Sequence, residues 1–345
     1  NGGAQALHKK LKRYRMVKTI LSLEKAIDLR SFYYPVHTQR GIIHDVDSFG
    51  ISGNILVQGY VGQGKSILMR YLASNEILRG RGKIPVLVEL RSIRRRPLER
   101  FLRDELELLN LKMSERLFSY FASNGRLVLL LDGFDELDDD IQQNVAEEID
   151  AFARRYEATK IVVGSRPNSA IASSSYFTSV NLSPLTPTEY PIVSARLASE
   201  KIAAQIRGKL SKERSPVTEV LTTPLMVALL IVRYRIEHTV PENELAFYSD
   251  LLDLLIRRHD QSKGGFRRKR RSKIGDHALK RVFFGVCYLT RKHKSDLEFS
   301  LSELERFVAN VCTRLSIDGA PDRIATDIVR VTNLILEEGG ICRFV

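Results

Sequence analysis

Residues 54–66, NILVQGYVGQGKS, decide the fold of this chain. The first five are a short apolar run bounded by glycines, which predicts a buried strand. Residues 59–66 follow at once and fit the pattern G-x-x-x-x-G-K-[ST] without exception. Residues 65–80 then carry helical spacing and end at Gly80, a typical helix stop. A strand, a glycine-rich loop and a helix in this order predict a phosphate-binding loop.

The residue types of this loop have chemical reasons. The glycines let the backbone curl so that its N–H groups point inward, and these donors bind phosphate oxygens together with the positive end of the following helix. Lys65 is expected to reach the β- and γ-phosphates, and the Ser66 hydroxyl to bind Mg²⁺. The nucleotide-binding candidates are therefore Gly59, Tyr60, Val61, Gly62, Gln63, Gly64, Lys65, Ser66 and Ile67.

A second stretch, RLVLLLDGFDELDDD at residues 126–140, runs from an apolar strand into six carboxylates. Asp132 ends the strand, and strand ends of a parallel sheet face the ligand crevice. Asp132 is therefore expected to hold Mg²⁺ through water. Either Asp135 or Glu136 is expected to position or deprotonate the water that attacks the γ-phosphate. The three acids at 138–140 precede a helix and are predicted to cap its N-terminus.

The order of the predicted elements indicates the fold class. Further strands are predicted at 84–91, 126–132 and 159–167, with a fifth within 176–185, and helices separate them. Strands that alternate with helices indicate a parallel sheet covered on both faces, a three-layer α/β/α arrangement. After about residue 188 the spacing is helical.

Two further predictions concern the ends of the chain. Residues 11–27 carry apolar side chains at helical spacing and are predicted to form a helix, as are residues 321–340. The tail GICRFV, residues 340–345, is predicted to begin a β-hairpin.

Composition sets wider limits. The chain has 345 residues, 43% hydrophobic and 28% charged, which is ordinary for a globular protein of two or three domains. Its apolar runs are too short to span a bilayer. Its three cysteines lie far apart without metal-ligand spacing, which indicates a reducing compartment, and we expect the cytoplasm. Because the chain begins with Asn1, we expect it to be a fragment.

The formal net charge is +13, and two basic segments, 9–15 and 263–273, carry much of it. Like-charge runs are usually solvated loops. Contact with a nucleic acid is the alternative interpretation, and the sequence leaves both open.

The loop at 59–66, the strand that ends in DGFDE at 132–136 and the strand that ends in SRP at 165–167 together resemble the NACHT NTPases, which are signalling ATPases of the STAND class. The resemblance runs from about Phe32 to the end of the chain. The doubled acidic motif, with the small Gly133 beside the magnesium aspartate, separates this family from ordinary AAA+ proteins, which carry a plain DE.

The resemblance implies roles for further residues. Arg166 resembles the sensor arginine that reads the γ-phosphate, so Asp135, Glu136, Lys65 and Arg166 are the catalytic candidates. Pro224 resembles the proline that packs on the adenine. Tyr34 and Pro35 belong to an aromatic-proline segment that often lines the adenine pocket in the family.

The resemblance also implies a domain order: an N-terminal linker helix and adenine-side segment at 1–50, a nucleotide-binding domain at 51–186, a helical domain at 187–262 and a winged-helix-like domain, truncated at its C-terminal end, at 263–345. In the family a winged-helix histidine often holds the ADP β-phosphate. His277 and His293 lie in this region, but neither lies in a matching motif.

The resemblance implies an ATP/ADP-dependent switch that forms a homo-oligomer when ATP replaces ADP, with slow hydrolysis as the reset. An N-terminal effector and a C-terminal sensor for an unknown trigger, such as a pathogen protein, are expected outside this chain. Defence signalling, against phage in a bacterium, is the expected setting, without a membrane partner. Two alternatives stay open: an AAA+-like motor or loader on nucleic acid, and a nucleotide-gated nucleic-acid-binding regulator.

Overall fold

The computed structural model describes residues 13–167, 169–212, 217–244, 246–249, 252, 271–293, 298–329, 335–338 and 341–344. These residues belong to two compact units. The first unit takes Asn1–Val17, Lys25–Ala204 and Leu221–Val227, and the second takes Lys18–Glu24, Gln205–Val220 and Ala228–Val345.

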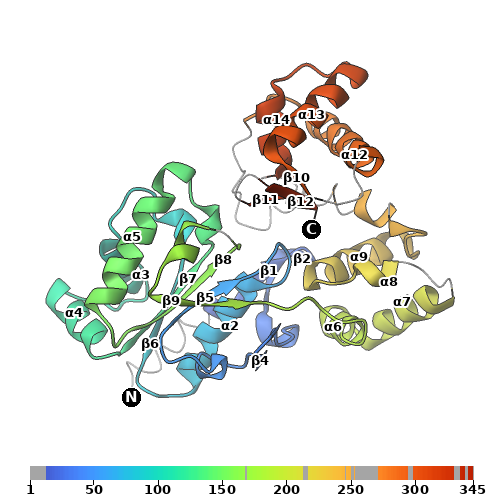
Figure 1. Cartoon of the computed structure of the whole chain (residues 1–345). Coiled ribbons are helices and arrows are strands. Elements are labelled where there is room, and N and C mark those ends of the chain that lie inside the picture. The colour runs from blue at the N-terminus through green and yellow to red at the C-terminus, as the bar shows by residue number, and fades with distance from the viewer. Residues whose placement is uncertain are drawn as a thin grey trace. The chain divides into compact units, whose positions relative to one another are not determined.

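A parallel five-stranded sheet is the centre of the first unit (Figure 1). Its strands are β5 (Asn54–Gln58), β6 (Ile84–Glu89), β7 (Leu127–Asp132), β8 (Lys160–Ser165) and β9 (Phe177–Asn181), in the order β6-β7-β8-β5-β9. The chain passes from β5 to the far edge, returns through β7 and β8, and crosses to the other side of β5 at β9. The strand order therefore reverses at β5, and ligands of such sheets bind beyond the carboxyl ends of the strands at this point.

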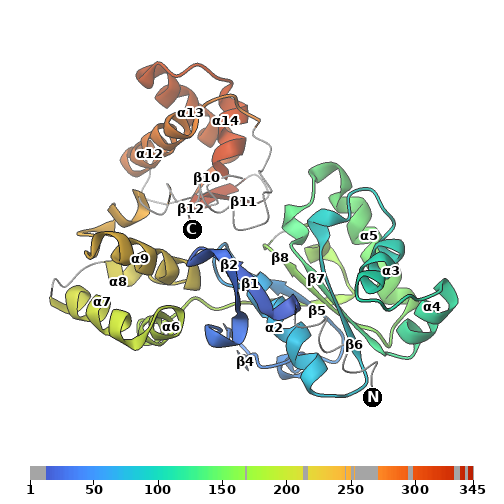
Figure 2. The ribbon, with the colours of Figure 1, turned by 180° about the vertical axis from the view of Figure 1, so that it is seen from behind.

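Helices cover both faces of this sheet. Helix α2 (Lys65–Leu78) packs against β6, β7 and β8 on one face, and α3 (Leu98–Leu108), α4 (Glu115–Ser123) and α5 (Asp139–Arg155) lie on the other (Figures 1 and 2). Every residue of β7 is buried, as expected for a strand covered on both faces. The predicted three-layer α/β/α arrangement with a parallel sheet is confirmed.

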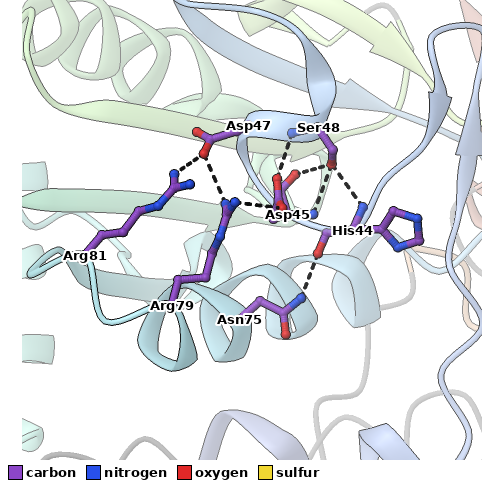
Figure 3. A network of polar contacts seen from close by, with 7 residues as sticks. All are labelled: His44, Asp45, Asp47, Ser48, Asn75, Arg79 and Arg81. Atoms are coloured by element: carbon purple, nitrogen blue, oxygen red, sulfur yellow. Dashed lines mark hydrogen bonds and ion pairs between the residues drawn. The ribbon is translucent and has the colours of Figure 1, made fainter.

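A polar network fixes the C-terminal end of α2 to the loop before β5 (Figure 3). The Arg79 guanidinium lies 3.2 Å from Asp45 Oδ2 and 3.1 Å from Asp47 Oδ2. The Asn75 side chain donates a hydrogen bond of 2.7 Å to the His44 carbonyl oxygen. Because these contacts hold the far end of the helix, they also help to fix the position of its first turn, where the glycine-rich loop ends.

Helices dominate the chain after β9, as predicted. They are α6 (Tyr190–Leu197), α7 (Glu200–Lys212), α8 (Val217–Val220) and α9 (Pro224–Glu237). The division between the two units passes through α9, whose first four residues belong to the first unit.

The C-terminal region of the second unit combines three helices with a small sheet. Its elements are, in chain order, α12 (Asp276–His293), β10 (Glu298–Ser300), α13 (Leu301–Leu315), α14 (Pro321–Asp327), β11 (Ile335–Glu338) and β12 (Ile341–Phe344). The strands are antiparallel, in the order β10-β12-β11. A capping box between Ser300 and Glu303 begins α13. Among the described helices, none has the length and apolar character needed to cross a membrane.

The structure corrects three element predictions. Residues 11–27 were expected to form a helix, but β1 (Met16–Thr19) and β2 (Ser22–Asp28) form a two-stranded sheet there. Burial alternates along β1, and its β-branched Val17 and Thr19 favour a strand. The helix expected at 321–340 ends much earlier, because β11 pairs with β12. The tail was expected to begin a β-hairpin, but β12 is instead the second strand of a hairpin whose first strand is β11.

Most of the two basic segments, residues 9–12 and 263–270, lies outside the described residues. The described end of the second one is fixed by Asp327, which is 1% exposed. Asp327 accepts hydrogen bonds from the backbone N–H of Arg271, at 2.9 Å, and of Ser272, at 2.8 Å.

Candidate nucleotide-binding site

The glycine-rich loop has the geometry that its sequence requires. Gly62 has φ 83° and Gly64 has φ 90°, both in the left-handed region that favours glycine. Gly64 is the N-cap of α2, so Lys65 and Ser66 are the first two helical residues. The Lys65 ammonium donates to the carbonyl oxygen of Tyr60 at 3.1 Å and to that of Gly59. The lysine thus closes over the loop in which it is expected to bind phosphate.

The side chain of Gln63 braces this loop from inside, a role that the sequence did not reveal. Its Oε1 accepts a hydrogen bond of 2.6 Å from the Tyr60 N–H, and its Nε2 donates to the Leu182 carbonyl oxygen at 3.4 Å. Leu182 in turn donates its N–H to the Gln58 carbonyl oxygen at 2.8 Å. A Cβ atom on Gly59 would lie 2.7 Å from Gln63 Oε1, so a larger residue there would displace the bracing side chain of Gln63.

The first turn of α9 packs on the loop. The Leu225 N–H donates to the Gly62 carbonyl oxygen at 3.3 Å. A Cβ atom on Gly62 would lie 2.6 Å from Leu225 Cβ and 3.1 Å from Thr223 Oγ1. Pro224 is the first residue of the helix, where proline is well tolerated. The structure thus places Pro224 beside the phosphate loop, and its contact with adenine stays a prediction.

Tyr34 lies in a cluster around Glu189. Its hydroxyl donates to Glu189 Oε1 at 3.0 Å, and His37 Nε2 lies 3.3 Å from the same oxygen. Thr186 donates to Glu189 Oε2 from its N–H at 2.8 Å and from its hydroxyl at 2.7 Å. Burial alone would raise the pKa of Glu189, but these hydrogen bonds outweigh it and lower the pKa. Glu189 was not among the predicted site residues, because an acid that precedes a helix is a weak signal in a sequence.

The residue before Tyr34 makes the direct contact with the helix of the glycine-rich loop. The Tyr33 ring stacks on that of Tyr71 in α2, with 3.8 Å between the ring centroids. Ile67, a nucleotide-binding candidate, packs against the same apolar cluster. Pro35 is partly buried. The aromatic segment therefore lies beside α2, with Tyr33 rather than Tyr34 facing that helix.

The acidic motif forms a tight turn at the end of β7. Asp132 is 8% exposed, and Gly133, with φ 74°, begins the 3₁₀ turn η4 (Phe134–Glu136). Arg166, which follows β8, places its Nε 2.9 Å from Asp135 Oδ2. The structure thus brings the predicted sensor arginine and one of the two candidate acids together as an ion pair.

Glu136 pairs with a different arginine. Arg91 Nη1 lies 3.4 Å from Glu136 Oε2, and Arg91 Nη2 donates to Glu89 Oε2. Arg70 of α2 donates to Glu89 Oε1 at 2.8 Å. The register pairs Glu89 of β6 with Asp132 of β7, so arginines lie among the carboxylates. These arginines had no predicted role, although polar residues at the carboxyl end of a predicted strand were a usable signal.

The predicted helix cap is only partly as expected. Asp138 occupies the N-cap position of α5, but its side chain makes no capping hydrogen bond. Asp140 instead pairs with Arg95 at 2.9 Å on the surface.

The residues expected to hold Mg²⁺ fit such an ion. Ser66 lies on the first turn of α2, and Asp132 ends β7, with β8 between β5 and β7. On β8, a Cβ atom at Gly164 would lie 2.9 Å from Met69 Cε and 3.3 Å from Asp132 Oδ1, so glycine lets α2 and this carboxylate approach the strand closely. A hydroxyl, a carboxylate and water are the ligands that Mg²⁺ prefers, and the ion would neutralise charge on the phosphates.

The loop geometry and the order of the strands define a P-loop NTPase domain. Residues 54–190 match the family model described as the NACHT domain. This part of the chain is therefore a NACHT domain, which confirms the family that the sequence resembles.

Solved structures with a similar arrangement include three of low sequence identity. They are the RuvB Holliday junction branch migration motor of Thermotoga maritima (14% identity, TM-score 0.37, 85% of this chain and 84% of that chain), Cdc6p of Pyrobaculum aerophilum (13%, 0.32, 85% and 84%) and the Aeropyrum pernix ORC1 protein in complex with DNA (15%, 0.37, 85% and 82%). At these TM-scores the likeness supports no inference about activity. A comparison with curated proteins gave no match.

Proposed function

We propose that the protein is an ATP/ADP-dependent switch of the STAND class that oligomerises on activation in defence signalling. ADP holds the resting state, exchange for ATP activates the protein, and slow hydrolysis resets it. The NACHT domain supports the nucleotide chemistry. Activation by an external trigger, through sensor and effector regions outside this chain, and a cytoplasmic location belong to the same proposal.

One observation carries the switch: the first turn of α9 rests on the phosphate loop. Leu225 contacts Gly62 through a backbone hydrogen bond of 3.3 Å and through its side chain. The same helix continues into the second unit from Ala228 onward. A change in the loop when the γ-phosphate is bound or lost can therefore pass through this hydrogen bond into a helix that continues into the second unit. Such a ligand shifts the equilibrium only through contacts that differ between the two states.

Arg166 supplies a contact of this kind. Its ion pair with Asp135 lies beyond the carboxyl ends of β7 and β8, the edge of such a sheet where ligands bind. The γ-phosphate of ATP would give Arg166 an additional charged partner that ADP lacks. In this proposal Lys65 binds the phosphates, Ser66 and Asp132 hold Mg²⁺, and Asp135 and Glu136 serve hydrolysis.

We further propose that residues 263–345 form a winged-helix-like domain and residues 187–262 a helical domain, between which the nucleotide signal passes. The order of the C-terminal elements, helix, strand, two helices and two strands, with β12 between β10 and β11, supports the first assignment. The nucleotide-binding domain at 51–186 and the segment at 1–50 complete the arrangement.

Helices α13 and α14 of this C-terminal region do not favour the nucleic-acid alternatives. A basic recognition helix would be the footprint of such a function. The short helix α14 instead places Asp322 next to Arg323, and α13 carries two glutamates and two arginines. We therefore propose the switch alone.

The test is the nucleotide content of the purified protein, measured by denaturation and chromatography of the released nucleotide. We expect close to one ADP per chain and its loss in Lys65→Ala. Lys112→Ala is the matched control, because the Lys112 side chain is 83% exposed and pairs only with a surface acid in α3. Protein without nucleotide that hydrolyses added ATP steadily would overturn the switch in favour of a motor.

A further inference from the structure

The two adjacent acids of the η4 turn are held by different arginines from different strands. Asp135 pairs with Arg166 after β8, at 2.9 Å, and Glu136 pairs with Arg91 after β6, at 3.4 Å. The four side chains are between 14% and 19% exposed. The pairs are therefore largely shielded from water, where an ion pair orients its members more strongly than on the surface.

Arg91 bridges two carboxylates. One terminal nitrogen of its guanidinium faces Glu136 and the other faces Glu89. Glu89 is itself held by Arg70 of α2, through a hydrogen bond of 2.8 Å. The chain of contacts from Arg70 to Glu136 thus runs from the helix of the phosphate loop to the acidic turn.

We propose that Arg91 is a positioning residue for ATP hydrolysis, which holds Glu136 where this carboxylate orients the attacking water, while Asp135 serves to aim Arg166. This inference rests on the proposed function. In the step that Glu136 assists, the water oxygen bonds to the γ-phosphorus, the bond from that phosphorus to the bridging oxygen breaks, and ADP leaves with phosphate. Glu136 accepts the water proton and later releases it to solvent.

The geometry assigns different tasks to the two acids. Asp135 contacts the arginine that the γ-phosphate is expected to engage, so its charge acts on Arg166. Glu136 contacts one terminal nitrogen of Arg91. The other terminal nitrogen donates to Glu89, which lies outside the acidic turn, so Glu89 anchors Arg91. A planar guanidinium can bridge two carboxylates at fixed angles, whereas a lysine ammonium acts as a point charge.

The test is a double-mutant cycle of Arg91→Gln and Glu136→Gln, measured as the single-turnover rate constant for ATP hydrolysis and the Kd for ATP. We expect Arg91→Gln to lower the rate constant by about 10- to 100-fold, as misplacement of a reacting group does. The Kd for ATP should change by less than about threefold, because no contact with nucleotide is lost. In the Glu136→Gln background, Arg91→Gln should then have almost no further effect.

A matched control comes from the same loop. Arg95 pairs with Asp140, with side chains 83% and 59% exposed, and Arg95→Gln should leave both readouts at wild-type values. Should Arg91→Gln have a lowered melting temperature, the cycle is repeated with Arg91→Lys, which fills the same space. We expect the rate constant of Arg91→Lys to lie between those of the wild type and Arg91→Gln. Lysine keeps the positive charge but lacks the planar guanidinium that bridges the two carboxylates.

The two ways of failing are distinct. Effects of Arg91→Gln and Glu136→Gln that multiply in the double variant would overturn the positioning role while leaving the ATPase intact. A full rate in Glu136→Gln would overturn it as well, and would assign the water to another group. Wild-type protein that carries no ADP and neither binds nor hydrolyses added ATP would instead contradict the proposed function itself.

Discussion

The two sides of the nucleotide site are built in different ways. The phosphate side is built on contiguous motifs: the loop at 59–66 lies between β5 and α2, and Gln63 braces Tyr60 within it, while Leu182 and Leu225 add contacts from outside. The expected base side is assembled from distant segments, because Tyr34, which is predicted to line the adenine pocket, is fixed by Glu189, 155 residues further along the chain. The phosphate side is thus set by local chemistry, and the base side depends on the tertiary fold.

This difference predicts where substitutions act. A change in the phosphate loop should affect nucleotide binding and stability together, because the loop backbone both binds the phosphates and forms part of the fold. A change in the Glu189 cluster should act on stability first, since the hydrogen bonds to this carboxylate from Tyr34 and Thr186 hold together segments of the fold.

Gly62→Ala should have the largest effect. The added Cβ would lie 2.6 Å from Leu225 Cβ, at a φ of 83° that other residues rarely adopt. We expect a loss of about 2–5 kcal/mol of stability from strain and overpacking, together with loss of bound ADP. Melting temperature and nucleotide content measure the two effects.

Gly208→Ala is the control for this substitution. Gly208 lies within α7, and a Cβ there would meet nothing within 4 Å, so the variant should be neutral or gain up to about 1 kcal/mol. If Gly62→Ala kept the ADP content of the wild type, the loop would tolerate a change in its backbone. That result would contradict the expected difference between the phosphate side and the base side.

Glu189→Gln should have an intermediate effect that depends on pH. The lowered pKa of Glu189 means that its contribution is complete well above the ordinary value of 4.5 and is lost as the pH falls through the folded-state pKa. We expect Glu189→Gln to cost about 1–3 kcal/mol at pH 7. Thermal unfolding at pH 7 and below pH 4.5 should show the difference from wild type shrinking in acid. A difference that stays constant would show that the charge plays no part.

Tyr34→Phe should have the smallest effect. It removes the 3.0 Å hydrogen bond to Glu189 and keeps the ring, so we expect a loss of about 0.5–1.5 kcal/mol. If Tyr34 also lines the adenine pocket, the Kd for ADP should rise with little change in that for inorganic phosphate. An unchanged Kd for ADP would show that Tyr34 is a structural residue only, and that the Glu189 cluster acts on stability and not on nucleotide binding.

Much of the phosphate side could be predicted from the sequence. Each residue from Gly59 to Ser66 lies in a pattern that local backbone geometry imposes, and the alternation of apolar strands with helices gave the parallel sheet. The prediction of a helix at 11–27 was wrong because short apolar runs fit both the helical and the strand period. Strand pairing then decided in favour of a strand. Arg91 and Glu89 were not recognised because their roles come from the neighbouring strand β7, which lies about forty residues further along the chain.

By itself, therefore, the sequence determined the phosphate loop, the acidic turn and the NACHT family, since each depends on residues a few positions apart. Only the tertiary structure decided which arginine holds which acid, that Leu225 rests on Gly62, and that Glu189 holds Tyr34. These contacts join segments that strand order and helix packing bring together. No pattern of neighbouring residues in the sequence predicts such contacts. The physical reason is that backbone conformation is set mainly by near neighbours, whereas the pairing of buried charges is set by whichever opposite charge the fold brings within reach.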